Sequence, residues 1–209
     1  MLAYYFTTAE YGLKGIRERR LKIARIRELN DPFELLAPEL SDKKKRAGLK
    51  KWKENQDRQY GLLCFCRSWH NPVLWGHYAE KHKGICLGFE VQPNKLKRVR
   101  YVTTRAPWPD QLDEAFTSDL ISTKFVRWSY EEEYRLYLRL ESDEADLYFE
   151  NFGKKMVLKR VIVGSQFPLS RAKIDDALGN LRENVEVFKA RSAFKTFRVV
   201  RNKNESLWA

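Results

Sequence analysis

Residues 60–91, YGLLCFCRSWHNPVLWGHYAEKHKGICLGFEV, contain the local signals on which the fold depends. The two ends of this stretch, residues 60–67 and 84–91, are apolar runs of strand length. Between them, Asn71-Pro72 is a typical helix start, because the fixed φ of proline suits the first helical turn. The stretch therefore predicts a strand, a short helix and a second strand.

The sequence on either side predicts more strands than helices. Because strands and helices do not alternate regularly, we expect one α+β domain over residues 1–209, built on an antiparallel or mixed sheet. In an alternating strand at 133–140, we expect Arg135 and Arg139 on a solvated or ligand-facing side. Further strands are expected at residues 3–8, 21–26, 98–103, 156–164, 185–190 and 195–201, and helices at 9–19, 41–59, 110–119 and after Ser170.

The composition is that of a folded, strongly basic protein. The 209 residues are 43% hydrophobic, and 40 basic residues against 28 acidic ones give a formal net charge of +12. Such an excess attracts polyanions and phosphate-bearing ligands. No apolar run approaches the roughly 18 residues of a membrane span, and the first residues lack the pattern of a secretion signal. With three cysteines, an odd number, we expect free thiols and a cytoplasmic location.

Much of the positive charge is concentrated in residues 41–59, which we interpret as a basic helical insertion with Ser41 as its N-cap. Such a helix is either a solvated face or a docking arm for the phosphates of a nucleic acid. Tryptophans are the candidate stacking platforms for the bases of a single strand. The candidate residues are Lys44, Lys45, Arg46, Lys50 and Lys51 for the phosphates, and Trp52, Trp69, Trp75 and Trp108 for the bases. Trp75 and Trp128 flank apolar segments, however, and we expect both to be buried.

Every cysteine and histidine lies between Cys64 and Cys86, and their side chains are the ligands that zinc prefers. Cys64 and Cys66 belong to one strand, however, and a CxxC knuckle is missing. The sequence also lacks a Gly-rich phosphate loop and a GxSxG elbow. We therefore expect no metal site.

Three adjacent carboxylates, Glu131, Glu132 and Glu133, precede the alternating strand. They repel one another, so basic residues or a ligand must offset their charge. Strand alternation places Glu131 and Glu133 on one face. The pattern fits an exposed strand start with local ion pairs, or a carboxylate that points into a cleft. A metal-dependent nuclease is a further alternative, if Asp31, Glu34, Glu131 and Glu133 converge on Mg²⁺.

Five blocks follow one another along the chain: Asn30-Asp31-Pro32-Phe33-Glu34, Cys64-Phe65, Trp75-Gly76-His77-Tyr78-Ala79, His82-Lys83-Gly84 and Trp128-Ser129-Tyr130-Glu131-Glu132-Glu133-Tyr134-Arg135. In order and spacing they resemble the bacterial and phage family DUF2971. The resemblance covers roughly residues 4–165. The family name by itself implies no activity.

The order of strand, helix, Tyr78, strand and Glu133 is similar to that of the ADP-ribosyltransferase superfamily. This resemblance implies a split β-sheet with flanking helices and the cleavage of NAD as a substrate. It implies that Tyr78 stacks on the nicotinamide and that Glu133 is the catalytic carboxylate, with Glu131 as the competing candidate. Tyr5 or Tyr4, with Thr7 nearby, lies where the superfamily carries its opening His or Arg.

The same resemblance implies further roles and partners. His77 would help to position the substrate, and Arg25 would bind the pyrophosphate, for which Arg17, Arg20 and Arg27 are also candidates. A transferase of this kind acts as a toxin or phage-defence effector on a nucleic-acid or protein acceptor, and an antitoxin or defence-system protein is its expected partner. The alternative is a nucleic-acid-binding module on a degenerate fold, without catalysis.

Overall fold

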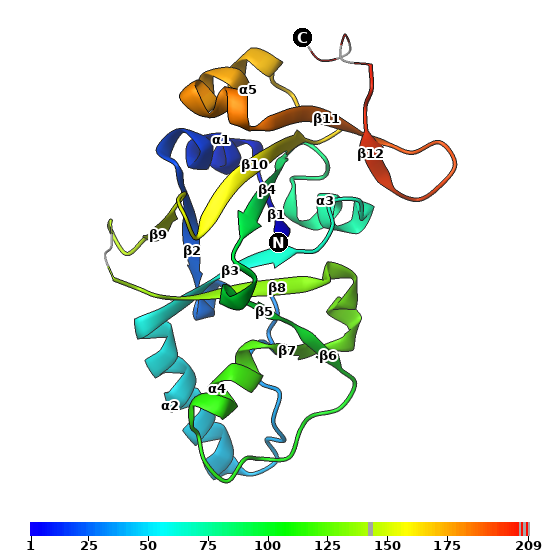
Figure 1. The fold of residues 1–209 in the computed structure, drawn as a ribbon. Helices are drawn as coiled ribbons and strands as arrows, with labels where there is room; N and C mark the ends of the chain where they lie inside the picture. The colour runs from blue at the N-terminus through cyan, green and yellow to red at the C-terminus, as the bar shows by residue number, and fades with distance from the viewer. Residues whose placement is uncertain (142–143, 205, 207, 209) are drawn as a thin grey trace. The chain divides into compact units, whose positions relative to one another are not determined.

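The computed structural model describes residues 1–141, 144–204, 206 and 208, and its fold is mixed α+β (Figure 1). The chain groups into two compact units, each assembled from separate segments. Unit 1 comprises Met1–Leu21, Phe65–Pro93 and Glu150–Ala209. Unit 2 comprises Lys22–Cys64 and Asn94–Phe149.

Unit 1 is built on a mixed sheet. Neighbouring strands follow the order β12-β11-β10-β4-β1, and only β10 and β11 are parallel among these pairs. The strands are β1 (Leu2–Thr7), β4 (Ile85–Val91), β10 (Met156–Val163), β11 (Glu186–Ser192) and β12 (Val199–Arg201). The helices are α1 (Ala9–Glu18), α3 (Pro72–Tyr78) and α5 (Arg171–Leu178), with short 3₁₀ turns η2 (Pro93–Lys95) and η4 (Gly179–Asn184).

The core of unit 1 lies between this sheet and its helices. Trp75 of α3 is fully buried, and its ring meets Phe6 of β1 edge-on at 5.3 Å between centroids. Thr8 caps α1 by accepting a hydrogen bond from the backbone N–H of Tyr11. At Gly84 the backbone passes so close to β1 that an added Cβ would overlap the carbonyl oxygen of Thr7.

Unit 2 contains shorter strands, and the boundaries between the units fall inside three strands, β2, β3 and β9. β2 pairs with β3, β8 pairs with β3 and β5, and β6 runs parallel to β7. The strands are β2 (Arg20–Arg25), β3 (Tyr60–Cys66), β5 (Leu96–Arg98), β6 (Arg100–Val102), β7 (Thr123–Phe125), β8 (Glu133–Arg139) and β9 (Tyr148–Asn151). The helices are α2 (Lys43–Gln59) and α4 (Glu114–Ile121), with 3₁₀ turns η1 (Ile26–Glu28) and η3 (Val126–Glu131).

The core of unit 2 is a separate apolar cluster. Leu49 of α2 and Leu62 of β3 are almost fully buried and pack with Leu120 of α4. Trp52 and Trp108 pack against the same cluster. The basic helix α2 is thus fixed to the unit through its apolar side, while Lys43, Lys44, Lys50 and Lys51 remain exposed.

Most of the predicted elements form close to their predicted bounds, and the expected mixed α+β class is confirmed. Three details were wrong. Asp42, not Ser41, caps α2, because its carboxylate accepts from the backbone N–H groups of Lys44 and Lys45. Arg135 is fully buried and not solvated. Residues 195–198, predicted to be strand, belong to the loop before β12.

The chain groups into two compact units, whereas the sequence predicts one domain over residues 1–209 with an insertion at 41–59. Grouping by contacts does not test whether the units fold as one domain, so that expectation stays a prediction. In the described part of the chain, no helix has both the length and the apolar composition that crossing a bilayer requires.

We expect the Gly84→Ala variant to be less stable than the wild type by about 1–3 kcal/mol, because its Cβ would overlap the backbone of β1. Gly76→Ala is the matched control: in the same unit, an added Cβ meets no atom within 4 Å, and alanine favours the interior of α3. Urea unfolding of both variants measures the difference. Equal stability of the two variants would contradict the close approach at Gly84.

Candidate functional site

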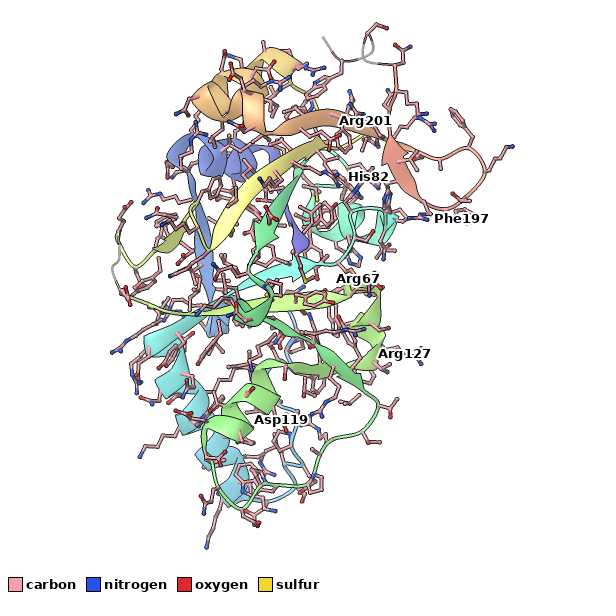
Figure 2. All side chains as sticks on the ribbon, in the orientation of Figure 1. Arg67, His82, Asp119, Arg127, Phe197 and Arg201 are labelled. Carbon is pink, nitrogen blue, oxygen red and sulfur yellow. The ribbon has the colours of Figure 1, made fainter. Side chains whose placement is uncertain are left out.

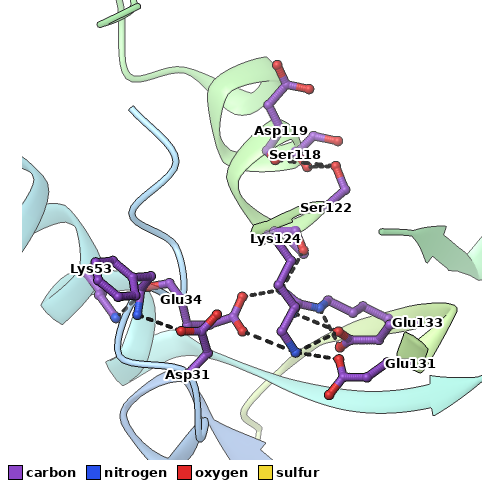
Figure 3. Close-up of polar contacts among 12 residues, drawn as sticks. Asp31, Glu34, Lys53, Ser118, Asp119, Ser122, Lys124, Glu131 and Glu133 are labelled. Atoms are coloured by element: carbon purple, nitrogen blue, oxygen red, sulfur yellow. Dashed lines mark hydrogen bonds and ion pairs between the residues drawn. The ribbon is translucent and has the colours of Figure 1, made fainter. Parts of the chain in front are cut away.

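A cluster of five buried charged side chains lies in unit 2 and includes both predicted catalytic carboxylates (Figure 3). They come from three parts of the sequence. Glu34 follows the Asn30-Asp31-Pro32 turn, and Lys124 is the middle residue of β7. Glu131 ends η3, whereas Glu133 and Arg135 open β8. We call these five residues the ion-pair cluster.

Arg135 is the central donor of the ion-pair cluster. Its Nε donates to Glu133 Oε1 at 2.7 Å and its Nη2 to Glu133 Oε2 at 3.1 Å, so the two groups form a bidentate pair. Its Nη1 donates to Glu34 Oε1 at 2.7 Å and to the carbonyl oxygen of Ile121 at 2.8 Å. The guanidinium therefore joins β8 to the turn at Glu34 and to the end of α4.

Lys124 is shared among three carboxylates. Its Nζ lies 2.6 Å from Glu131 Oε2, 3.2 Å from Glu133 Oε2 and 3.9 Å from Glu34 Oε2. The same ammonium lies 4.8 Å from the centroid of the Trp128 ring, a cation–π distance. The carboxylates considered for Mg²⁺ thus converge on an ammonium, apart from Asp31, which accepts from the backbone N–H of Phe33 at 2.9 Å.

The backbone around Glu132 explains why Glu131 and Glu133 face the same cation. Glu132 has a left-handed conformation with φ of 44°, and Glu131 lies in η3 and not in the strand. The expectation that the two side chains share one side is confirmed, although the turn and not strand alternation is the reason. The backbone N–H of Glu133 donates to the hydroxyl of Tyr101 at 2.8 Å, which fixes the start of β8.

The charges shift the titration of the groups in the ion-pair cluster. Burial alone would raise the pKa of Glu133, but Arg135 and then Lys124 outweigh it and lower that pKa to about 2. Burial opposes the charge of Lys124, yet Glu133, Glu131 and Glu34 together raise its pKa. Burial, with a further contribution from Glu133, raises the pKa of the Cys64 thiol well above its usual value. Glu133 is therefore ionised near neutral pH, and Cys64 is no activated nucleophile.

The other predicted site residues are distributed over both units. Tyr5 and Thr7 lie in β1 of unit 1, where the Tyr5 ring meets Phe65 edge-on at 6.0 Å. His77 and Tyr78 end α3 in the same unit, and their rings are nearly perpendicular, with centroids 6.0 Å apart.

Arg25, the candidate for the pyrophosphate, belongs to unit 2 and is buried. Its guanidinium pairs with Asp57 at 3.1 Å and with Asp146 at 2.6 Å. Its charge is thus already offset by two carboxylates. Of the alternatives, Arg20 pairs with Glu18 at 2.8 Å, and Arg17 is exposed.

The predicted phosphate-binding lysines form the outer side of α2. Lys44, Arg46, Lys50 and Lys51 are exposed, whereas Lys45 is half-buried and lies 5.9 Å from the centroid of the Trp108 ring. The predicted stacking platforms are not on that surface. Trp75 is buried as expected, and so is Trp69, whereas Trp128 is only half-buried. Trp52 and Trp108 pack on the core of unit 2.

A cavity of about 250 Å³ in unit 2 was not predicted from the sequence. Lys124 contributes to its lining as well as to the ion-pair cluster, together with Phe125 from β7 and Phe33. Both phenylalanines are more than a third exposed, at 44% and 58% respectively. Asn30, Asp31 and Pro32 predicted a turn at this place, but nothing in the sequence indicated a cavity.

Among the residues that the structure describes, no group of three His, Cys, Asp or Glu side chains is placed to hold a metal ion. Cys64, Cys66 and Cys86 are free thiols. Comparisons of the chain with protein-family models, curated proteins and solved structures found no match.

We expect the Arg135→Met variant to lose about 3–5 kcal/mol of stability, because Glu133 and Glu34 would remain buried without their main counter-charge. Arg139→Met is the matched control in the same strand: Arg139 is exposed, and a change there alters stability by about 0.5 kcal/mol or less. Denaturant unfolding monitored by circular dichroism compares the two. A loss for Arg135→Met no larger than for Arg139→Met would contradict the buried network.

Proposed function

We propose that the protein is an NAD-dependent transferase of the ADP-ribosyl type, of the toxin or phage-defence kind, on an ADP-ribosyltransferase-like split sheet. The observation that carries the proposal is the state of Glu133. It opens a strand, it is ionised, and Arg135 holds both of its oxygens in a fixed orientation. Glu133 is the candidate catalytic carboxylate, and Glu131 is the second candidate.

The chemistry of ADP-ribosyl transfer calls for such a group. The bond between C1′ of the ribose and the nicotinamide nitrogen breaks, and nicotinamide leaves with the electron pair. The ribose becomes an oxocarbenium-like cation. An acceptor oxygen or nitrogen attacks this cation, and the acceptor atom loses its proton to solvent. A carboxylate that is already ionised and oriented stabilises the cation without reorganising in the transition state.

In the ion-pair cluster, one contact of Glu133 has to open before this carboxylate can reach a substrate. Glu133 is only 3% exposed, and its Oε2 contacts both Arg135 and Lys124. For Glu133 to reach a ribose, the 3.2 Å contact with Lys124 must open. Lys124 then retains its shorter contact of 2.6 Å with Glu131, so the ammonium stays paired.

The resemblance to ADP-ribosyltransferases gives the nicotinamide-binding role to residues that belong to unit 1. Tyr78 is half-buried and His77 exposed at the end of α3, and both present rings suited to stacking on a flat heterocycle. Tyr5 and Thr7 of β1 are half-buried and lie where the superfamily carries its opening His or Arg. Arg25 would need to leave its two carboxylates before it could bind the pyrophosphate, whereas Arg17 is exposed and is the more accessible candidate.

We expect purified protein to release nicotinamide from NAD, and Glu133→Gln to reduce that rate by about 100-fold or more, because the amide cannot offset the ribosyl cation. Glu132→Gln is the matched control, since Glu132 is the exposed neighbour and makes no contact with Lys124 in the described cluster. Transfer of label from adenylate-labelled NAD to RNA, DNA or protein identifies the acceptor.

Thermal unfolding shows whether Glu133→Gln remains folded, and Glu131→Gln separates the two candidate carboxylates. Full activity of a folded Glu133→Gln variant would remove Glu133 from the mechanism. The absence of any NAD binding or turnover by the wild type, with and without nucleic acid, would overturn the proposal.

A second candidate function, nucleic-acid binding without catalysis, is favoured by α2. Its 17 residues contain eight basic side chains against Glu54 and Asp57, and one side of the helix is anchored by Leu49. The exposed lysines are therefore held in a fixed row, which suits phosphates along a backbone.

We expect the Lys44→Ala/Lys51→Ala variant to bind DNA duplex less tightly, and the slope of log K against log salt to fall by about 0.9 for each phosphate that the variant no longer binds. Lys14→Ala/Lys173→Ala removes two exposed lysines from α1 and α5 and is the matched control. Fluorescence anisotropy over a salt series measures both. An unchanged slope for the α2 variant would exclude α2 as the DNA-binding surface.

A further inference from the structure

The loop that joins β11 and β12 in unit 1 carries two exposed aromatic rings, one of which, Phe197, is labelled in Figure 2. Phe194 is 90% exposed and Phe197 is 99% exposed, the largest values among the exposed large hydrophobic residues of the described chain. Burying a phenylalanine is favourable by about 1.5–3 kcal/mol relative to leaving it in water. Two such rings on one loop therefore indicate a surface that is covered when a partner binds.

The hairpin holds these rings in a defined geometry. The backbone N–H of Ala193 donates to the carbonyl oxygen of Arg198 at 2.9 Å, across the loop. At its base, the N–H of Val199 donates to the carbonyl oxygen of His70 at 2.8 Å, and His70 Nδ1 lies 2.7 Å from the Val199 oxygen. The loop is thus closed by a bond of its own and tied to His70 on the β12 side, so its backbone needs little further ordering when a ligand binds.

The charge around the rings identifies the partner. Residues 187–203 contain six basic side chains and no acidic one. Lys195 and Arg198 are exposed between and beside the rings. The guanidinium of Arg191 lies 4.3 Å from the centroid of the Phe194 ring, so a cation and a ring form one continuous surface.

We infer that the β11–β12 hairpin is a binding site for single-stranded nucleic acid, with Phe194 and Phe197 stacking on unpaired bases and Lys195 and Arg198 contacting phosphates. Aromatic rings interleaved with cations are how proteins bind single strands without reading their sequence. Paired bases in a duplex are already stacked and offer no face to the rings. The site therefore prefers single strands, in contrast to the row of lysines on α2.

A lipid surface is the competing partner, and the arrangement of the rings disfavours it. Phe194 and Phe197 are separated by Lys195 and Thr196, and Arg198 follows directly. Membrane-bound segments bury a continuous apolar face. Here polar residues interrupt the two phenylalanines along the loop, and two of the three are cationic, so the segment has no continuous apolar run to insert among acyl chains.

Binding at the hairpin does not depend on transferase activity, and it differs from binding at α2 in place and in preferred ligand. The test measures binding of fluorescein-labelled oligothymidylate of about 20 nucleotides, a length that covers more than one site of this kind. Phe194→Ala/Phe197→Ala should raise Kd by about 5-fold per ring and so by about 25-fold in total. Tyr11→Ala, which removes an exposed ring from α1, is the matched control and should leave Kd unchanged.

Two further variants separate stacking from charge. Phe194→Leu/Phe197→Leu keeps apolar side chains without flat rings and should weaken binding nearly as much as the alanine variant. Lys195→Ala/Arg198→Ala should lower the salt slope by about 0.7 for each phosphate that the variant no longer binds. If the single strand is held at the hairpin, Lys44→Ala/Lys51→Ala should keep the oligothymidylate Kd within about twofold of the wild type. Weaker binding in this variant alone would place the single strand on α2 and overturn the inference.

All variants change exposed side chains, and equal thermal midpoints check that they fold. A Kd for Phe194→Ala/Phe197→Ala within about twofold of the wild type would overturn the inference, as would failure of the wild type to bind the oligonucleotide. Vesicles of phosphatidylglycerol and phosphatidylcholine form the last arm. Vesicle binding that survives in Phe194→Leu/Phe197→Leu, with no oligonucleotide binding, would assign the hairpin to a lipid surface instead.

Discussion

The bidentate pair of Arg135 and Glu133 is the interaction on which the rest of unit 2 depends. A buried guanidinium and a buried carboxylate are each costly to remove from water, and they are tolerated only with full hydrogen-bonding partners. Arg135 uses its remaining donors on Glu34 and on the carbonyl oxygen of Ile121. One side chain thereby determines where β8, the turn at Glu34 and the end of α4 meet.

The same pair sets the chemical character of the candidate site. A carboxylate in an apolar pocket tends to protonate, but Arg135 and Lys124 keep the pKa of Glu133 low. The site therefore holds a permanent, oriented negative charge beside a cavity that Lys124 also lines. Stability and proposed chemistry share one network, so a substrate that reaches Glu133 competes with Lys124 for the same oxygen.

Basic side chains are exposed on two surfaces that differ in their aromatic content. On α2 of unit 2, exposed lysines form a row on a helix anchored by Leu49, with the tryptophans on the inner side. On the β11–β12 hairpin of unit 1, cations alternate with the exposed rings of Phe194 and Phe197. A row of charges alone can contact only a phosphate backbone, whereas rings with charges can also stack on unpaired bases.

Local sequence was sufficient for most elements, because periodicity and caps act over a few residues. The strand–helix–strand of residues 60–91 and the basic helix followed from such signals, and β3, α3, β4 and α2 form there. The shared side of Glu131 and Glu133 was also predicted. The reason given was wrong, because the left-handed residue Glu132 and not strand alternation produces it.

Local patterning predicted the mixed α+β class, and composition predicted the basic surface, since both depend on residue types and local spacing alone. Only the tertiary structure decided that Arg135 is buried, that Arg25 is already paired, and that Trp69 is core while Phe194 is exposed. Burial and ion pairing depend on residues far apart in the chain: Arg135 and Glu34 are 101 positions apart. No local sequence pattern can show a contact between residues so far apart. Whether a charged or aromatic side chain is buried, paired or exposed is therefore decided only when the chain has folded.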